Sequence, residues 1–529
     1  MLQTALEHHH AGRPDVAEQL YRAVLQTDVE NTDALNLLGV LEYERSQNLV
    51  ALHWLSKAVE LAPQTAMYHN NLGLVLVALG LHGEAAARFE QAGQLDAGLQ
   101  DTFHNLAVAR QKLGRVDEAI AAYLKALALA EEPGTLSNLG AAYLKIGRCQ
   151  DAMRCLERAL QLQPDNVDAL VNVAAALVAS GRADEAVLAY DKAIEVGADD
   201  PVIYHNRSHA RLVLGDFARG WDDYEYRWLW KEFPTQRPSF TQPAWTGDDL
   251  KGRTLLVYSE QGLGDTIQFV RYLRHLADQG ASAIFKGPTE LKSLLGDLGG
   301  ACQVLDANQP LPPFDVHAAL MSLPRLCGTR LENIPASVPY LPVPPAERLP
   351  LPPALPGRFR IGLVWAGGPR QFDDVLRSIP LLEFLPLLQI AGYDFYSLQV
   401  GPRAADLATL PAGLSVTDIG TRVRDFADTA AVMGQLDLII SVCTSTLHLA
   451  GALARPAWGV LRYAADWRWL LGREDSPWYP TMRLFRQPTP GDWESVVARL
   501  AKALQDRSFR PALFAPTSPR KEPDPKQLR

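Results

Sequence analysis

A glycine turn followed by an aspartate is the first feature of this sequence whose residues suit chemistry. Residues 254–276, TLLVYSEQGLGDTIQFVRYLRHL, read as a buried strand, a turn at Gly262-Leu263-Gly264, and a helix with apolar residues at helical spacing. Glycines at such a turn, Gly264 included, let the backbone pass close to a bound group. Asp265 begins the helix at the carboxyl end of a strand, where α/β proteins place their chemistry. The alternative is that Asp265 only caps the helix.

Hydroxyl residues mark a second junction between a strand and a helix. A strand over 437–442 is followed by Thr444 and Ser445, and the apolar run 447–454 continues as a helix. Hydroxyl side chains cap a helix at such a position, and the free N–H groups of the first turn form an anion site that suits a diphosphate. Ordinary capping is the alternative interpretation.

Basic residues follow a third strand in the loop 366–380, AGGPRQFDDVLRSIP. Arg370 and Arg377 are placed to neutralise a phosphate leaving group. Alternatively, they pair with Asp373 and Asp374 as a solvated charge cluster.

The elements that position these residues alternate between strands and helices throughout the C-terminal half. This alternation predicts parallel sheets. The expected strands cover residues 254–259, 281–286, 302–306, 315–320, 359–366, 393–399, 414–418, 436–442 and 456–461. A proline-rich stretch from Pro339 to Pro356 interrupts the pattern and marks a domain boundary. We therefore expect two Rossmann-like halves that enclose a cleft in which a donor and an acceptor meet.

The first 230 residues contain an internal repeat of about 34 residues. Small residues recur with this period at Gly39, Gly73, Ala107, Gly140, Ala174 and Ser208. An alanine follows twelve positions after each of the first five, and a large residue sixteen positions after. The pattern resembles the tetratricopeptide repeat family, which implies an α-solenoid of six or seven helical hairpins with a concave binding face.

Asparagines near the start of the first helix of each hairpin are expected on that concave face. They are Asn36, Asn70, Asn105, Asn138, Asn172 and Asn206. Their arrangement resembles the asparagine ladder that holds an extended peptide in protein O-glycosylating enzymes with such repeats. We select Asn105, Asn138 and Asn172 as acceptor-binding residues, and solvated helix positions are the alternative. The aromatic stretch over 215–233 is interpreted as a mainly structural junction.

Composition narrows the class of protein. The net charge of −9 argues against a general affinity for nucleic acid or anionic membranes. No run of 18 apolar residues is present, so integral membrane contact is not expected and a cytoplasmic location is the default. The five cysteines form no CxxC pair, which argues against a zinc site or a disulfide framework.

A set of motifs in the C-terminal half resembles bacterial tetratricopeptide-repeat glycosyltransferases. Their catalytic half is similar to the heptosyltransferase family and has the GT-B fold. The motifs are EQGLGDTIQFVRY, GLVWAGGP with RSIP, SLQVGPR, DFADTAAVMGQLDLIISV, TSTLHLAGALARP and DWRWLLGREDSPWYPTMRLFRQ. The resemblance implies that Asp265 is the general base and that Thr444, Ser445 and His448 contact the donor. This chain departs from the family at Cys443, where the family usually has aspartate, as well as at Gly368, Gln371, Phe372 and Val400.

Together these features predict an inverting glycosyltransferase that moves a sugar from a nucleotide-sugar to a hydroxyl of a protein held by the repeats. We expect no metal and no cofactor beyond this co-substrate, because no Asp-X-Asp motif is present and Arg377 supplies a cation near the departing diphosphate. The alternatives are an inactive tetratricopeptide scaffold and a transferase acting on lipopolysaccharide or another glycan.

The same features divide the chain into five parts. These are the solenoid with its capping helix over 1–230, a Rossmann-like half over 231–340, a proline-rich linker over 341–357, a donor-binding half over 358–506, and a disordered tail over 507–529.

Overall fold

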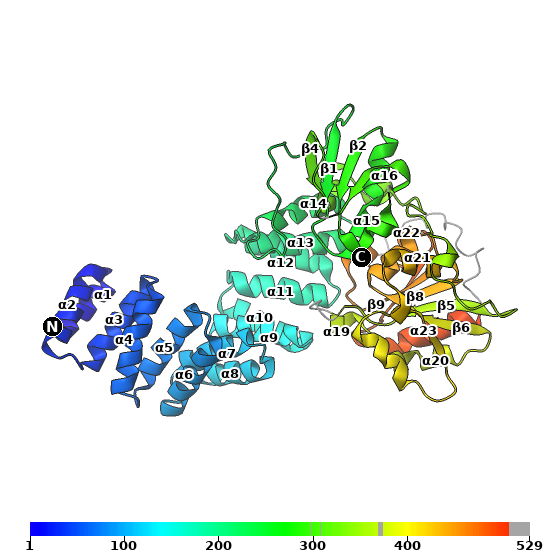
Figure 1. Ribbon diagram of the computed structural model, residues 1–529. Helices are drawn as coiled ribbons and strands as arrows, with labels where there is room; N and C mark the ends of the chain where they lie inside the picture. The colour runs from blue at the N-terminus through cyan, green and yellow to red at the C-terminus, as the bar shows by residue number, and fades with distance from the viewer. Residues whose placement is uncertain (297, 307, 369–373, 507–529) are drawn as a thin grey trace, which may run out of the picture. The chain divides into compact units, whose positions relative to one another are not determined.

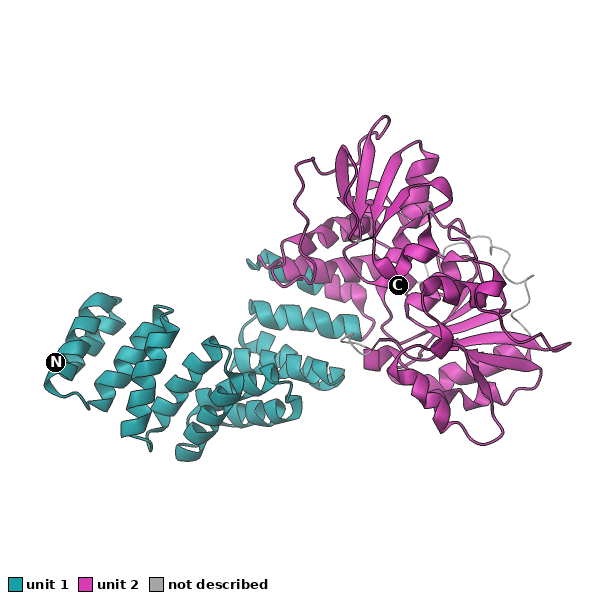
Figure 2. Ribbon diagram, in the orientation of Figure 1, with its two compact units in different colours: residues 1–179, 188–198 teal, residues 180–187, 199–529 magenta. Residues whose placement is uncertain are grey.

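The computed structural model describes residues 1–296, 298–306, 308–368 and 374–506. Figure 1 shows its helices and strands. The chain forms two compact units, which are residues 1–179 with 188–198, and residues 180–187 with 199–529 (Figure 2). The tail over 507–529, predicted to be disordered, lies outside the described residues, as do Arg370, Gln371, Phe372 and Asp373.

Fourteen helices, arranged as antiparallel hairpins, occupy residues 2–224, all of which are described. Their bounds are α1 Leu2–His10, α2 Pro14–Thr27, α3 Thr32–Glu44, α4 Asn48–Leu61, α5 Ala66–Ala78, α6 His82–Leu95, α7 Gln100–Lys112, α8 Val116–Leu129, α9 Pro133–Lys145, α10 Cys149–Leu162, α11 Val167–Ala179, α12 Ala183–Glu195, α13 Pro201–Val213 and α14 Phe217–Tyr224. Within the first unit each hairpin packs against the next along the chain (Figure 1). The predicted solenoid of tetratricopeptide type is confirmed.

The turn inside each hairpin holds one residue with a positive φ angle. These residues are Gly12, Ser46, Gly80, Gly114, Gly147, Gly181 and Gly215, with φ between 62° and 83°. Glycine adopts this left-handed conformation without steric cost, which explains its place in six of the seven turns. The turns therefore define seven hairpins, including the degraded first one.

Close packing inside a hairpin explains the small residues of the repeat. A Cβ atom added at Gly73 would lie 2.5 Å from Phe89 Cε1, and one added at Gly39 would lie 2.6 Å from Leu55 Cγ. Phe89 and Leu55 are the large residues sixteen positions later, and both are fully buried. The small residue thus makes room for the large residue of the same hairpin, whereas the sequence pattern alone does not show which hairpin it contacts.

Helices α13 and α14 belong to the C-terminal unit. Trp221 of α14 packs edge to face on Trp467, with ring centroids 5.1 Å apart, and on Phe269 at 6.1 Å. Asp222 pairs with Arg325 at 2.7 Å. The sequence assigns these helices to a solenoid domain over 1–230, whereas their contacts place them in the unit of 199–529.

The rest of the second unit contains two sheets in which all strands are parallel. The first has the order β3-β2-β1-β4 and the second the order β10-β9-β8-β5-β6-β7. The strands are β1 Thr254–Tyr258, β2 Ser282–Lys286, β3 Gln303–Leu305, β4 Val316–Ala319, β5 Phe359–Val364, β6 Tyr393–Ser397, β7 Val416–Asp418, β8 Leu438–Val442, β9 Ala457–Leu461 and β10 Met482–Arg486. The nine predicted strands are confirmed, and β10 is the strand that the sequence pattern did not predict.

Helices cover the sheets of this unit. They are α15 Leu263–Phe269, α16 Arg271–Asp278, α17 Lys292–Leu295, α18 Leu323–Leu326, α19 Asp374–Arg377, α20 Leu385–Leu388, α21 Phe426–Gly434, α22 Ser445–Ala452 and α23 Trp493–Gln505. In the second sheet α20 and α23 lie on one face, and α21 and α22 on the other (Figure 1). Strands β5 and β8 are neighbours with Leu363 beside Ile440, so the loops at their carboxyl ends meet at one edge.

Candidate functional site

Asp265 lies in the first turn of α15, directly after the loop that leaves β1. One carboxylate oxygen accepts the backbone N–H of Gly262 at 3.0 Å, so Asp265 does cap the helix. The other oxygen pairs with the guanidinium of Arg468. Burial raises the pKa of Asp265, against the opposing effect of Arg468. The carboxylate therefore combines a capping bond with a desolvated ion pair.

Arg468 is the centre of the charge network around Asp265. Its Nη1 donates to Asp466 at 2.8 Å, and its Nε donates to Gln268 at 2.9 Å. The guanidinium lies 4.1 Å from the ring centroid of Trp467. Burial alone would lower the pKa of Arg468, but Asp466 and Asp265 raise it, so the side chain stays charged. No role was predicted for Arg468 from the sequence, and its position between Trp467 and Trp469 is the available signal.

The start of α22 packs directly against the glycine turn of α15. A Cβ atom added at Gly264 would lie 3.2 Å from His448 Cδ2 and 3.5 Å from Ser445 Cα. The side chain of Thr444, the N-cap residue, makes no capping bond, and its hydroxyl lies 3.3 Å from Ser441 Oγ. The expected hydroxyl cap by Thr444 is therefore wrong. The expected proximity of Gly264, Ser445 and His448 is present.

His448 is buried in an aromatic setting. Its ring stacks on Trp469 with centroids 5.3 Å apart, and its Nδ1 lies 3.0 Å from Tyr479 OH. Burial, together with the nearby charge of Arg468, lowers the pKa of His448 to about 3. The imidazole is therefore neutral near pH 7, so it offers a ligand a polar contact and no positive charge.

Arg377 connects the loop after β5 to the loop after β8. Its Nη1 donates to the carbonyl of Cys443 at 3.1 Å, and its Nε pairs with Asp374 at 3.1 Å. The indole N–H of Trp469 donates to Cys443 Sγ at 3.1 Å. Burial raises the pKa of Cys443 to about 11, so its thiol is neutral near pH 7.

Two residues of the last hairpin also face this network. Tyr224 of α14 accepts a hydrogen bond from the Gln261 amide at 2.5 Å, just before the glycine turn. Burial lowers the pKa of His209 in α13 to about 4. The charge of Asp466 raises this pKa, and the charge of Arg468 lowers it further. The aromatic stretch over 215–233, expected to be mainly structural, thus includes a side chain bonded to the loop that carries Asp265.

The asparagines of the first unit fall into two positions of the repeat. Asn105, Asn138 and Asn172 lie two residues before the small residue of their repeats and are partly exposed. Asn36 and Asn70 lie three residues before it and are buried, with 6% and 9% exposed. The expected ladder therefore changes position between its second and third members, and Asn71 is the residue that matches Asn105.

Hydrogen bonds join these two positions between neighbouring hairpins. The Asn71 amide donates to Asn36 Oδ1 at 2.9 Å, and the Asn105 amide donates to Asn70 Oδ1 at 3.4 Å. The Asn172 amide donates to Ser137 Oγ at 3.1 Å. Because each of these donating asparagines uses an N–H, its own carboxamide oxygen remains to accept a hydrogen bond from a bound peptide.

Neither a metal-binding cluster nor a membrane-spanning helix is found in the described part of the chain. Among residues 1–506, apart from the gaps, no group of three or more His, Cys, Asp or Glu side chains is arranged to hold a metal ion. In the same described part of the chain, no helix is both long and apolar enough to cross a bilayer.

Comparisons with known proteins concern mainly the repeats. Models described as tetratricopeptide repeat match residues 99–165 and residues 2–66 and 137–201. Protein FlbA of Caulobacter vibrioides is 27% identical over 522 residues, which are 93% of this chain and 76% of FlbA. The crystal structure of MamA is 24% identical over 30% of this chain and 92% of that chain, with a TM-score of 0.29.

A tetratricopeptide repeat protein from Parabacteroides merdae is 15% identical, over 42% of this chain and 89% of that chain, with a TM-score of 0.37. The N-terminal part of this chain is an array of tetratricopeptide repeats, a protein-binding module, and a region of parallel sheets and helices follows it.

Proposed function

We propose that this chain is a cytoplasmic, inverting glycosyltransferase of GT-B type that transfers a sugar from a nucleotide-sugar to a hydroxyl of a protein. The observation that supports it most is the contact between the turn that precedes Asp265 and the first turn of α22. Gly264 allows this contact, because a Cβ atom there would lie 3.2 Å from His448 Cδ2 and 3.5 Å from Ser445 Cα. The residue next to this contact is acidic, and a carboxylate and a helix N-terminus suit a hydroxyl acceptor and a diphosphate donor.

In the proposed reaction Asp265 takes the proton of the acceptor hydroxyl while the oxygen attacks the anomeric carbon. The bond from that carbon to the diphosphate oxygen breaks, and the nucleotide diphosphate leaves with the electron pair. Ser445 and the N–H groups of α22 stabilise its charge, and Arg377 lies next to the same loop. The raised pKa of Asp265 favours proton transfer to it.

The array of repeats would select the protein acceptor. Asn105, Asn138 and Asn172 present amide groups that bind peptide backbone without reading its side chains. The proposal therefore assigns acceptor choice to the first unit and chemistry to the second. No metal or cofactor takes part in it.

A direct test compares two aspartates that accept backbone N–H groups at helix N-termini. Asp492, the N-cap residue of α23, accepts the Ser495 N–H at 3.0 Å, and Asp265, in the first turn of α15, accepts the Gly262 N–H at 3.0 Å. We expect Asp265→Asn to bind the nucleotide-sugar normally and to lower transfer by ~10²-fold or more, while Asp492→Asn keeps full activity. Transfer at the normal rate by folded Asp265→Asn would contradict the proposal.

The donor is first identified by thermal shift against UDP-, GDP-, ADP- and CMP-sugars, since a ligand of the native state raises Tm.

An inactive scaffold is the second candidate, and the ion pairs around the site favour it. Asp265 and Arg377 are each engaged with an oppositely charged side chain, and Cys443 is a neutral thiol. A scaffold binds partners through its repeats but shows no thermal shift with any of the four nucleotide-sugars. The thermal-shift screen therefore distinguishes the two candidates before any acceptor is known.

A further inference from the structure

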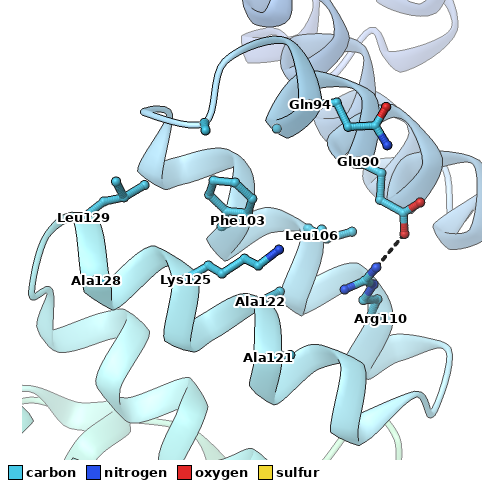
Figure 3. Close-up of a pocket in the computed structure, with 12 residues that line it drawn as sticks. Glu90, Gln94, Phe103, Leu106, Arg110, Ala121, Ala122, Lys125, Ala128 and Leu129 are labelled. Carbon is cyan, nitrogen blue, oxygen red and sulfur yellow. Dashed lines mark hydrogen bonds and ion pairs between the residues drawn. The ribbon is translucent and has the colours of Figure 1, made fainter.

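A pocket of about 580 Å³ opens on the solenoid between α6, α7 and α8 (Figure 3). Its volume lies in the range of sites that take small ligands or short peptide segments. The apolar part is formed by Phe103 and Leu106 of α7 and by small residues of the flanking helices, among them Gly93, Ala121 and Ala128. The pocket lies entirely within the first unit, so the candidate site around Asp265 takes no part in it.

The sequence of one repeat explains how Phe103 is seated in the pocket. Gly93 lies eight residues after Ala85, the repeated alanine of its hairpin, and the equivalent positions of other hairpins hold large side chains. These are Val59, Leu127, Leu160 and Ile194. The ring of Phe103 takes this place instead, because a Cβ atom at Gly93 would lie 3.0 Å from Phe103 Cε1. Among the five compared hairpins, only this one has a glycine at the position.

The two basic side chains of the pocket differ in their partners. Arg110 is neutralised, because it pairs with Glu90 at 2.7 Å and lies 3.5 Å from Glu118 (Figure 3). Lys125 extends over the Phe103 ring, 5.7 Å from its centroid, and has no carboxylate partner among the described residues. The pocket therefore combines an apolar floor with one ammonium group that is available for an anion.

This face differs from the one that carries the asparagines. On α7, Phe103 and Arg110 lie two and five residues from Asn105, which corresponds to rotations of roughly 160° and 140° around the helix axis. A ligand in the pocket and a peptide along the asparagines would therefore contact opposite sides of the helix. The two surfaces are able to bind different segments at the same time.

We propose that this pocket binds a peptide segment of a partner protein in which an aliphatic side chain is followed by a carboxylate. The aliphatic side chain packs on Phe103 beside Gly93 and Ala121. The carboxylate pairs with Lys125, the basic side chain of the pocket that has no carboxylate partner among the described residues. The site is separate from the proposed transferase chemistry and gives the array a second partner.

Saturation-transfer NMR with the full-length chain tests the proposal. The probes are acetyl-GSLESG-amide, its neutral form acetyl-GSLQSG-amide, and acetyl-GSSESG-amide, which lacks the leucine. We expect saturation of the leucine methyl groups in the first peptide, weakened about three- to fivefold by Lys125→Gln and lost in Ala121→Trp, which fills the pocket from an exposed position. The matched controls are Lys57→Gln, at the equivalent position of an earlier hairpin, and Ala87→Trp, on the exposed side of α6.

Each result bears directly on the proposal. The proposal is supported if the leucine–glutamate peptide binds better than the other two. This binding must be lost in Ala121→Trp and kept in Ala87→Trp. Equal binding of the neutral peptide would overturn the role of Lys125. Binding that persists in Ala121→Trp, or no saturation of any peptide up to about 5 mM, would show that the pocket is not a peptide site. Circular dichroism of every variant checks that the helices remain folded.

Discussion

Replacing Trp221 by alanine tests whether the last hairpin is part of the C-terminal unit. The side chain is 1% exposed and meets the rings of Trp467 and Phe269 edge to face. Removing a buried tryptophan costs roughly 3–5 kcal/mol, a range that includes the loss of such aromatic pairs. In a unit of more than 300 residues this corresponds to a decrease in Tm of roughly 5–10 °C.

The assay is thermal unfolding combined with hydrogen exchange read by mass spectrometry. We expect Trp221→Ala to lower the melting transition of the C-terminal unit and to speed exchange in β1, α15 and the segment around Trp467. Phe89→Ala is the matched variant, because Phe89 is equally buried but lies in α6 of the first unit. Faster exchange in α1–α10 after Trp221→Ala, with β1 and α15 unchanged, would refute the assignment of α14 to the second unit.

Three further changes have defined expectations. Glu260 follows β1 and is buried beside Arg227, whose Nη2 lies 3.1 Å from its carboxylate. Burial, against the opposing effect of Arg227, raises the pKa of Glu260 from 4.5 to about 7, so the stability from this group is complete below about pH 4.5 and is lost as the pH rises through 7. Urea titrations of Glu260→Gln should lack this pH dependence, which amounts to about 3 kcal/mol in the parent chain. Gly264→Val should push α15 from α22, lower stability by roughly 1–3 kcal/mol and abolish transfer, and a crystal structure with the two helices still in contact would contradict this. The triple replacement of Asn105, Asn138 and Asn172 by alanine should weaken transfer to a protein acceptor and leave hydrolysis of the nucleotide-sugar unchanged, as product chromatography would show.

Local patterns were sufficient to predict most of the fold. Period-34 spacing predicted the hairpins, since it reflects contacts within one repeat that are copied along the chain. Apolar runs between helical segments predicted nine strands. Strand β10 was not predicted because Met482–Arg486 contains two arginines among three apolar residues and so has no clear apolar run.

The candidate site was predictable only in part. The proximity of the turn before Asp265 to Ser445 and His448 was predictable, because each segment follows a recognisable strand. Arg468 was not, since it lies 203 residues from its partner Asp265 and no local spacing relates the two. The asparagine register was also misread, because Asn70 and Asn71 are adjacent and only the hydrogen bonds between hairpins show which one corresponds to Asn105.

The ion pair with Arg468 raises the question of how Asp265 is able to accept a proton in the proposed reaction. Protonation of Asp265 would normally leave a buried guanidinium without a counter-charge, which is costly. Here Arg468 keeps a second carboxylate, because its Nη1 donates to Asp466 at 2.8 Å. Burial alone would raise the pKa of Asp466, but Arg468 holds it below its ordinary value, so Asp466 stays ionised when Asp265 becomes neutral. The second carboxylate therefore makes a salt-bridged aspartate compatible with the role of a general base.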